Sequence, residues 1–207
     1  MRNPETERTR RIWEKTAPHY DRGISPFERL LVGDGRRWVC SRAASDVLEV
    51  AVGTGRNFPF YPAGVSLSAV DISPAMLAVA RERAGSLGMR VNLAEADAQA
   101  LPFEDESFDA VVSTLAMCSI PDERLALREM KRVLRSGGRL LLLDHVRSTS
   151  PVVFSLQRVL EPLSVRFAGD HLLRRPLERV VELGFSVEES RRCRKGIVEM
   201  LAARKPV

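Results

Sequence analysis

Short apolar stretches alternate with amphipathic ones over most of the chain. Residues 46–51 hold a short, valine-rich apolar run, which is typical of a parallel strand buried on both faces. Residues 139–144 hold four consecutive leucines and require the same double burial. Strands of similar character are predicted at residues 66–70, 90–94 and 108–114.

The amphipathic stretches between these strands predict helices. Ser73-Pro74 begins one of them, because serine caps a helix well and proline suits its first turn. Apolar residues at helical spacing follow as far as Gly88, which ends that helix. Two further helices are predicted, one at residues 122–134, which Ser136-Gly137-Gly138 stops, and one at residues 176–183.

The order of these elements predicts the fold class. Strands that alternate with helices imply a parallel sheet. The chain ends differently, because residues 185–191 and 197–203 have the pattern of two strands joined by a short turn at Lys195-Gly196. We therefore predict an α/β fold with a doubly wound, mostly parallel seven-stranded sheet and one antiparallel strand.

Two segments depart from simple alternation. Residues 1–44 are predicted to form a helical N-terminal cap, interrupted at Pro18, that closes over a ligand site or packs on the sheet. Residues 45–207 then form a single domain. Within it, residues 151–175 hold an amphipathic helix broken at Pro162, which is a lid over an apolar ligand, a surface that rests on lipid, or ordinary core packing.

Composition narrows the class of protein. Of the 207 residues, 44% are hydrophobic and 29% charged, and no apolar run reaches the ~20 residues of a membrane helix. Residues 1–11 are polar, so a secretory signal is not expected, and the three cysteines form neither a disulfide framework nor a metal-binding pattern. We therefore expect a cytoplasmic protein with no metal. The charge of +5 comes from scattered arginines, which does not favour nucleic acid but leaves peripheral membrane contact open.

Candidate chemistry gathers where the predicted strands end. The first strand breaks into Gly53-x-Gly55, which lets the backbone turn sharply and approach a ligand. Asp71 ends the second strand, where a carboxylate can accept hydrogen bonds from both hydroxyls of a ribose. Asp97 follows the third strand, where it can accept one from an adenine amino group. Since ligands of doubly wound sheets bind at the carboxyl ends of the strands, these residues favour one shared adenosine ligand.

This adenosine ligand is predicted to lack a diphosphate. The dinucleotide-binding pattern Gly-x-Gly-x-x-Gly needs a third glycine where this chain has Phe58. The turn also lacks the Gly-Lys-Ser/Thr of phosphate-cradling loops.

Several motifs occur together in the order in which one enzyme family has them. They are Glu49-x-x-x-Gly53-x-Gly55, Asp71, Asp97 with Leu101-Pro102-Phe103, Phe108-Asp109, and Val133-Leu134-Arg135-x-Gly137-Gly138. Over roughly residues 10–205 the chain thereby resembles the class I S-adenosylmethionine-dependent methyltransferases. The resemblance implies a Rossmann-like fold, S-adenosylmethionine as cofactor and S-adenosylhomocysteine as product.

The resemblance also implies roles for residues around the adenosine. Asp71 binds the ribose, and Ile72 or Met76 packs on the adenine. Asp97 and the backbone of Ala98 bind the edge of the adenine ring.

Further residues are implied around the methionine part of the cofactor. Glu49, Gly53 and Gly55 belong to the motif that lies beneath it, and Tyr20 belongs to a lead-in motif that closes over it. Leu115 lines the methyl-transfer site. Ala51 stands where the family has its usual first glycine, and its methyl group is tolerated if the backbone keeps a negative φ.

A second set of motifs carries a closer resemblance. The set comprises Gly55-x-Asn57-Phe58-x-x-Tyr61-Pro62, Thr114-Leu115-x-x-Cys118-Ser119, Asp144-His145-Val146 and Gly169-Asp170-His171-Leu172. It is similar to the small thiol S-methyltransferases of the methyltransferase-like-seven group and their bacterial relatives. Two residues of a Gly-Asp-Gly-Cys-His turn that these relatives often carry are missing here, so the acceptor does not follow from the resemblance.

The leading prediction is methyl transfer to a small, lipophilic acceptor, with a thiol as the first to be tested. A phospholipid N-methyltransferase or a quinone methyltransferase is the alternative with a different acceptor. A non-catalytic module that binds S-adenosylmethionine is the alternative of another class. The oligomeric state is not predicted.

Two histidines are the candidates for acid–base chemistry. His145, at the end of the fifth predicted strand, has an ordinary pKa suited to proton transfer at neutral pH, and His171 follows the predicted lid. Each can equally be structural, and a thiol acceptor needs little help to ionise. Arg56 either meets the carboxylate of the cofactor or is solvated, and Cys118 either lines the acceptor pocket or is buried and inert.

Overall fold

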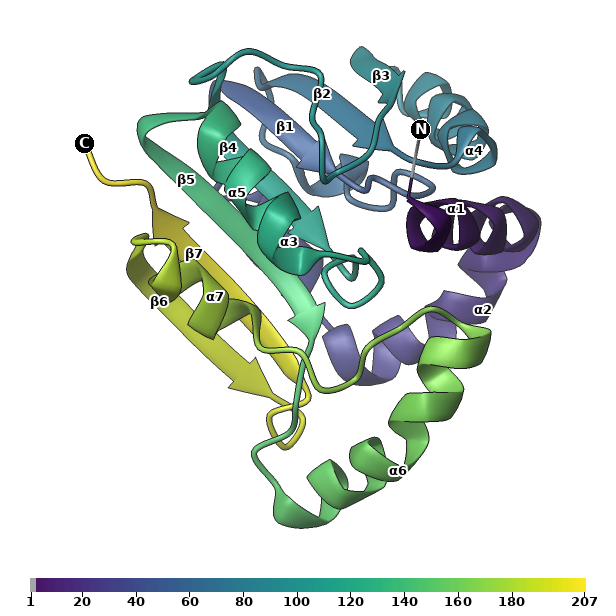
Figure 1. Cartoon of the computed structure of the whole chain (residues 1–207). Helices are drawn as coiled ribbons and strands as arrows, with labels where there is room; N and C mark the ends of the chain where they lie inside the picture. Colours follow the sequence, from purple (N-terminus) through teal and green to yellow (C-terminus); the bar gives the residue numbers. More distant parts are fainter. Residues whose placement is uncertain (1–2) are drawn as a thin grey trace.

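Seven strands form one sheet at the centre of the computed structural model, which describes residues 3–207. Their order across the sheet is β3-β2-β1-β4-β5-β7-β6 (Figure 1). The chain moves outward from β1 to β3 and then returns to β4 on the other side of β1, so the switch point of the sheet lies between β1 and β4. The strands are β1 (Asp46–Val50), β2 (Ser66–Asp71), β3 (Val91–Glu95), β4 (Phe108–Thr114), β5 (Leu134–His145), β6 (Ser186–Cys193) and β7 (Val198–Arg204).

The direction of the strands confirms the predicted fold class. Strands β1 to β5 pair in parallel, whereas β7 pairs antiparallel with both β5 and β6. Only β7 is therefore reversed in a mostly parallel, seven-stranded sheet.

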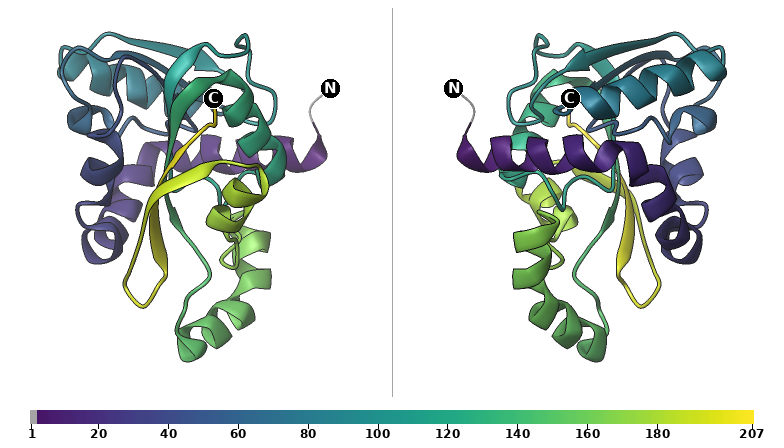
Figure 2. Two further views of the ribbon diagram at one scale, coloured as in Figure 1. Left: turned by 90° about the vertical axis from the view of Figure 1, so that its left-hand side faces the viewer. Right: turned by 90° about the vertical axis from the view of Figure 1, so that its right-hand side faces the viewer.

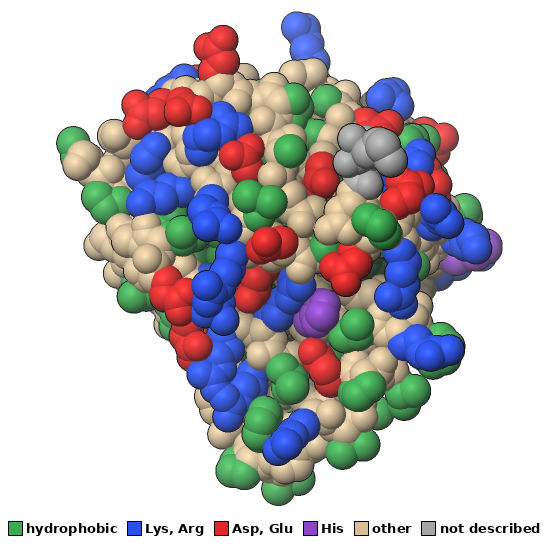
Figure 3. Space-filling model, viewed as in Figure 1, with side chains coloured by type: hydrophobic (Ala, Val, Ile, Leu, Met, Phe, Trp, Pro, Cys, Tyr) green, Lys and Arg blue, Asp and Glu red, His purple; other side chains and the backbone are tan. Residues whose placement is uncertain are grey.

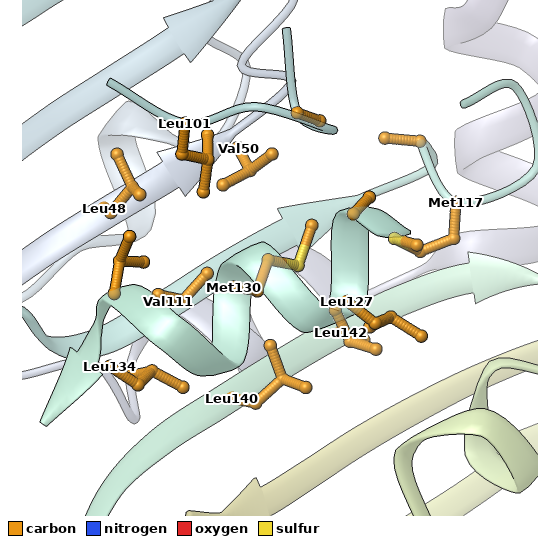
Figure 4. Close-up of a cluster of buried hydrophobic side chains, with 14 of the residues drawn as sticks. Leu48, Val50, Leu101, Val111, Met117, Leu127, Met130, Leu134, Leu140 and Leu142 are labelled. Atoms are coloured by element: carbon orange, nitrogen blue, oxygen red, sulfur yellow. The ribbon is translucent and has the colours of Figure 1, made fainter. Parts of the chain in front are cut away.

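Helices cover both faces of the sheet and bury two apolar clusters. Helices α5 (Glu123–Val133) and α7 (Pro176–Glu182) pack on one face, and α3 (Gly35–Cys40) and α4 (Pro74–Ser86) pack on the other. The leucines of β5 explain why both faces are needed, because Leu140 and Leu142 belong to the first cluster and Leu141 and Leu143 to the second. Figure 4 shows the first cluster between α5 and the strands.

Two predicted helix breaks are wrong. Ser136-Gly137-Gly138 does not stop the helix before β5, because α5 already ends at Val133 and the glycines lie within β5. Pro162 does not break α6 (Pro151–Phe167), which continues through it and bends along its length (Figure 1). A proline inside a helix removes one backbone donor, which is a common cause of such a bend.

The chain before β1 is helical where the structure describes it. Helix α1 (Pro4–Thr16) ends just before Pro18, and two further helical segments, η1 (Ala17–His19) and α2 (Tyr20–Phe27), lead into a π-helical turn. That turn, η2 (Glu28–Val32), ends at Gly33, whose φ of 55° suits glycine. The two views of Figure 2 show α1 lying across the molecule. Over residues 3–207, the longest apolar helix falls short of what a membrane crossing requires.

Candidate functional site

A cavity opens where β1, β2 and β4 end, and the N-terminal helices cover it. It encloses about 760 Å³ of empty space, counting the open space at its mouth. Nine of the predicted cofactor residues line it: Tyr20, Ala51, Gly53, Asp71, Ile72, Met76, Asp97, Ala98 and Leu115. Their roles toward a cofactor stay predictions, but the fold has brought them to one place.

Two of the six non-glycine residues with positive φ in residues 3–207 lie on the walls of this cavity. Ala51 has φ 57° and Leu115 has φ 54°, both in the left-handed region that L side chains avoid. The expectation that Ala51 keeps a negative φ is therefore wrong, because the turn after β1 requires the conformation that glycine adopts freely. Strained residues of this kind persist where the surrounding structure holds them, and they cluster at ligand sites.

The two glycines of the turn serve different purposes. Gly53 has φ 55°, and a Cβ placed there would meet nothing within 4 Å, which leaves room for a ligand at this wall of the cavity. Gly55 has φ 77°, and its Cβ would lie 2.4 Å from the ring of Phe58. Gly55 does not line the cavity, so its requirement for glycine comes from packing against Phe58.

Asp71 connects the turn after β1 with the start of α4. The backbone N–H of Gly53 donates to Oδ2 (2.8 Å), and that of Ser73 donates to Oδ1 (2.9 Å). Burial raises the pKa of Asp71 to about 6, although these N–H groups stabilise the ionised form. Each carboxylate oxygen retains a free lone pair, so the side chain can still accept hydrogen bonds from a ribose.

Asp97 is held by its neighbour Gln99. The backbone N–H and the side-chain amide of Gln99 donate to Asp97 Oδ1 at 2.9 and 3.0 Å. The same amide donates to Thr6 Oγ1 (3.0 Å), which connects this wall of the cavity to α1.

Glu49 lies beneath the turn and does not line the cavity. Its carboxylate accepts hydrogen bonds from Asn57 Nδ2 and from the Tyr61 hydroxyl, both at 2.8 Å. Burial raises the pKa of Glu49 to about 7. The residue therefore supports the loop, and its role toward a cofactor stays a prediction.

Arg36 is the main residue of the site that sequence reasoning missed. It is 7% exposed, lines the cavity, and donates from Nη1 to Asn57 Oδ1 and Thr114 Oγ1, both at 2.8 Å. Its Nη2 is 2.5 Å from Glu28 Oε1. Nothing in the sequence distinguishes Arg36 from its exposed neighbour Arg37, because both stand in a short amphipathic helix.

The N-terminal helices are tied down around the cavity by ion pairs. Asp21 of α2 accepts a hydrogen bond from Thr54 Oγ1 (2.7 Å) and pairs with Arg83 of α4. Arg56 lines the cavity, but its guanidinium is engaged by Glu28 (2.8 Å) and by Asp21 (3.4 Å). Arg56 is therefore not solvated. Its guanidinium is already paired within the protein rather than free for a ligand.

Neither candidate histidine lines the cavity. Burial and the nearby charge of Arg174 lower the pKa of His145 to about 4, so its ring is neutral and a weak base at pH 7. His171 lies with Nδ1 3.5 Å from Glu161 Oε1, and burial lowers its pKa as well. The structure therefore gives the predicted role as general base no geometric support.

Comparison with known proteins identifies the central part of the chain. Residues 48–142 match the family described as methyltransferase domain. The chain is thus similar to a methyltransferase domain over just under half of its length. Its fold is that of the class I methyltransferases: a S-adenosylmethionine-dependent methyltransferase of Methanosarcina mazei superposes with a TM-score of 0.65 at 21% identity, covering 80% of this chain and 94% of that one.

Curated relatives of the methyltransferase domain act on lipids or quinones according to their names. A phosphatidylethanolamine N-methyltransferase of Cereibacter sphaeroides is 40% identical over 48% of this chain and 50% of its own length. A ubiquinone/menaquinone biosynthesis C-methyltransferase of Hahella chejuensis is 41% identical over 54% of this chain and 47% of its own. The chain thus spans about half the length of these relatives. Neither is a thiol S-methyltransferase, and the closer resemblance to that group stays a prediction.

The residues of the cavity fit S-adenosylmethionine, the methyl donor that methyltransferase domains of this class use. The open space beside Gly53 and the acceptor oxygens of Asp71 suit an uncharged ribose. The two arginines that line the cavity, Arg36 and Arg56, are both paired with Glu28. When bound, this cofactor supplies an electrophilic methyl group on a sulfonium sulfur. The chain itself then has to align the acceptor and to exclude water.

Proposed function

We propose that this protein transfers a methyl group from S-adenosylmethionine to a small lipophilic acceptor that reaches the cavity from a lipid surface. The thiol, the amine of phosphatidylethanolamine and the ring of a quinol are the acceptor types, with the thiol tested first. The observation that carries the proposal is the outward-facing apolar side of α6, next to the helices that cover the cavity.

Helix α6 has its polarity reversed relative to a helix that packs on a core. Its buried side chain is Gln157, which donates to the Val146 carbonyl (3.0 Å) and accepts from the Ser148 N–H (2.8 Å). Large apolar side chains face outward instead, at intervals of three, four or one residue along the helix. They are Val152, Leu156, Val159, Leu160, Leu163 and Phe167, between 42% and 80% exposed. An apolar stripe of this extent indicates a lipid or protein contact.

The charges on α6 favour an anionic lipid surface. Arg158 and Arg166 are exposed, whereas the one acid of the helix, Glu161, is turned inward and accepts from the Leu172 N–H. Figure 3 shows hydrophobic and basic side chains together at the end of the molecule that α6 forms. Arginines beside an apolar stripe are typical of helices that lie in the membrane interface.

Helix α6 also approaches the cavity through α1. The guanidinium of Arg8 donates to the carbonyls of Val165 (3.1 Å) and Arg166 (2.5 Å), and α1 contributes Thr9 and Trp13 to the cavity wall. We retain in this proposal the N-terminal cap of residues 1–44 over a domain of residues 45–207, with 151–175 as its lid. The first two residues of that cap lie outside the described residues.

The experiment is an acceptor panel with release of S-adenosylhomocysteine as the readout. A lipophilic thiol, a quinol and phosphatidylethanolamine are each supplied in vesicles with an anionic lipid and, separately, as short-chain soluble forms. We expect one acceptor type to be methylated, and faster from vesicles. If calorimetry shows cofactor binding but no acceptor releases product, the protein is the non-catalytic module and the proposal fails.

The double variant Leu156→Glu/Val159→Glu tests the lipid contact. It should reduce vesicle binding and turnover of the vesicle-borne acceptor about tenfold or more, because two anionic groups would enter the interface, and should leave turnover of the soluble form unchanged. Val181→Glu is the matched control, since Val181 is 55% exposed but lies on α7. An equal loss in the control would contradict the role of α6.

A further inference from the structure

Three side chains able to bind a transition metal meet outside the cavity. Cys118 Sγ, a ring nitrogen of His145 and a carboxylate oxygen of Asp170 all lie within 4.8 Å of one another. They come from three separate segments: the loop after β4, the last residue of β5 and the turn after α6. Their wide spacing along the chain forms no metal-binding pattern, although all three stand in the motifs of the closer resemblance.

The Cys118 thiol donates to the Asp170 carboxylate, and the polar groups of the cluster have few partners outside it. Cys118 is 3% exposed. Asp170 Oδ1 is buried and has no hydrogen-bond partner within residues 3–207. Over the same residues, no hydrogen bond involves the imidazole of His145. A buried carboxylate oxygen without a partner is costly, and a bound ion is one of the few things that explains it.

Neighbouring groups hold the backbone of the cluster in place. The His171 N–H donates to the Cys118 carbonyl (2.9 Å), which joins the turn after α6 to the loop after β4. Asp144 Oδ1 accepts from the N–H groups of Ala116 (2.9 Å) and Met117 (3.0 Å). The ligand segments are therefore positioned by bonds outside the cluster, as supported metal sites require.

We infer that Cys118, His145 and Asp170 bind one Zn²⁺ ion. A thiolate, an imidazole and a carboxylate are the donor types that zinc takes, and the two anionic donors balance its charge. Bonds of about 2.0–2.3 Å place tetrahedral donors about 3.5 Å apart, so the side chains need to close by about 1 Å.

The cation nearest the cluster is already engaged. Arg174 donates to the carbonyls of Ile120 (2.6 Å) and Pro121 (3.1 Å), and its Nε lies 3.8 Å from a carboxylate oxygen of Glu123. These contacts fix the guanidinium in place and offset part of its charge, so it does not occupy the position of the ion.

Three protein ligands leave the fourth position of zinc open, as in catalytic sites. The cluster is close to the cavity, because Ser119 and Ile120, which directly follow Cys118 in the chain, line its wall. An acceptor thiol could therefore occupy the fourth position as a thiolate. That role for the ion rests on the proposed methyl transfer, whereas binding of the ion does not depend on it.

The test measures metal binding alone, so it stands or falls independently of methyl transfer. Tag-free protein is stripped with a chelator and titrated with Zn²⁺ against a competing chromophoric chelator, and with Co²⁺ by absorption spectroscopy. We expect one equivalent of zinc per chain, and with cobalt a thiolate charge-transfer band and the intense bands of tetrahedral coordination. Absence of the thiolate band in the wild type would overturn the inference.

Variants identify the ligands. Cys118→Ser, His145→Gln and Asp170→Asn should each weaken zinc binding by at least about tenfold. Cys193→Ser and His19→Gln are matched controls, since they remove the same donor types elsewhere in the chain and should bind zinc as the wild type does. The inference is overturned if the wild type takes up no more zinc than Asp170→Asn, or if the controls lose as much.

Discussion

Ala51 shows how a single residue stores strain at the cavity. Its φ of 57° costs an L residue about 1 kcal/mol relative to glycine. We expect Ala51→Gly to raise the free energy of unfolding by about 0.5–1 kcal/mol, because relief of this strain outweighs the added freedom of the unfolded chain. Denaturant unfolding measures the change. Ala69→Gly in β2 is the control of opposite sign, and a loss of stability in both variants would refute the explanation.

Asp71 connects protonation to cofactor affinity. Burial raises its pKa to about 6, and only the ionised carboxylate offers an acceptor at both oxygens. Affinity for S-adenosylhomocysteine should therefore fall about tenfold between pH 7 and pH 5, as the carboxylate is protonated. Calorimetry over this range checks it.

The variant Asp71→Asn separates this effect from other titrations. It should bind the product at least about tenfold more weakly at pH 7 and lose most of the pH dependence, because an amide offers one acceptor and does not titrate. A wild-type slope that persists in Asp71→Asn would mean that another group is responsible.

Site residues could be predicted from the sequence where they stand at the end of a strand, because the end of the strand fixes where they lie in the fold. Asp71 and Asp97 each follow a parallel strand, and parallel strands end at one edge, so the two carboxylates reach the same cavity. The place of Glu49 was harder to predict, because a motif does not say which face of β1 a residue occupies. With Val47 it points away from Leu48 and Val50, toward Tyr61.

At the scale of elements, Asp21 pins the N-terminal helices to the site. It joins α2 to the turn after β1 through Thr54 and to α4 through Arg83. Asp21→Asn should speed dissociation of S-adenosylhomocysteine several-fold and weaken its binding. The substitution removes the negative charge that pairs with Arg83 and Arg56. Stopped-flow release measures the rate.

Asp34→Asn is the matched control for Asp21→Asn. Asp34 is an exposed acid in the same helical region, and its side chain makes no helix-capping bond. Its release rate should equal that of the wild type, and equal acceleration in both variants would argue for a general charge effect.

Elements outside the sheet were harder to predict than its strands. Apolar runs such as that of β5 predict buried strands directly from the sequence. The end of α5 at Val133, in contrast, depends on a contact between distant residues, the pairing of Leu134 with Phe108. Likewise, the amphipathic pattern of α6 gave the helix but not which side faces the protein, because that depends on Gln157 finding backbone partners.

At the scale of the molecule, the buried carboxylate of Glu49 contributes a pH-dependent term to stability. Its pKa is about 7 in the fold against an ordinary 4.5, so this contribution is complete below about pH 4.5 and is lost as the pH rises through about 7. Relative to the wild type, Glu49→Gln should gain stability on going from pH 4.5 to 7, by on the order of 2–3 kcal/mol.

Denaturant unfolding of both proteins across this pH range gives the difference directly. Other groups titrate in the same window, but they are common to both proteins and cancel in the comparison. A difference that stays constant with pH would show that Glu49 is ionised in the fold throughout.

The fold class could be predicted from the sequence because several kinds of sequence pattern indicate the same sheet. Buried runs, helix caps and the final hairpin all predict one doubly wound sheet, and the observed order with its single reversed strand confirms it. The metal-binding cluster could not be foreseen, since Cys118, His145 and Asp170 meet only once three connections are folded.

The order of the segments along the chain has a consequence for how such a protein diversifies. The cavity residues that fit the donor all precede residue 122, whereas α6 and the turn after it follow residue 150 and lie beyond the stretch that matches the family. Under the proposed function, we therefore expect substitutions within residues 151–175 to change the acceptor preference while the residues that fit the donor stay unchanged.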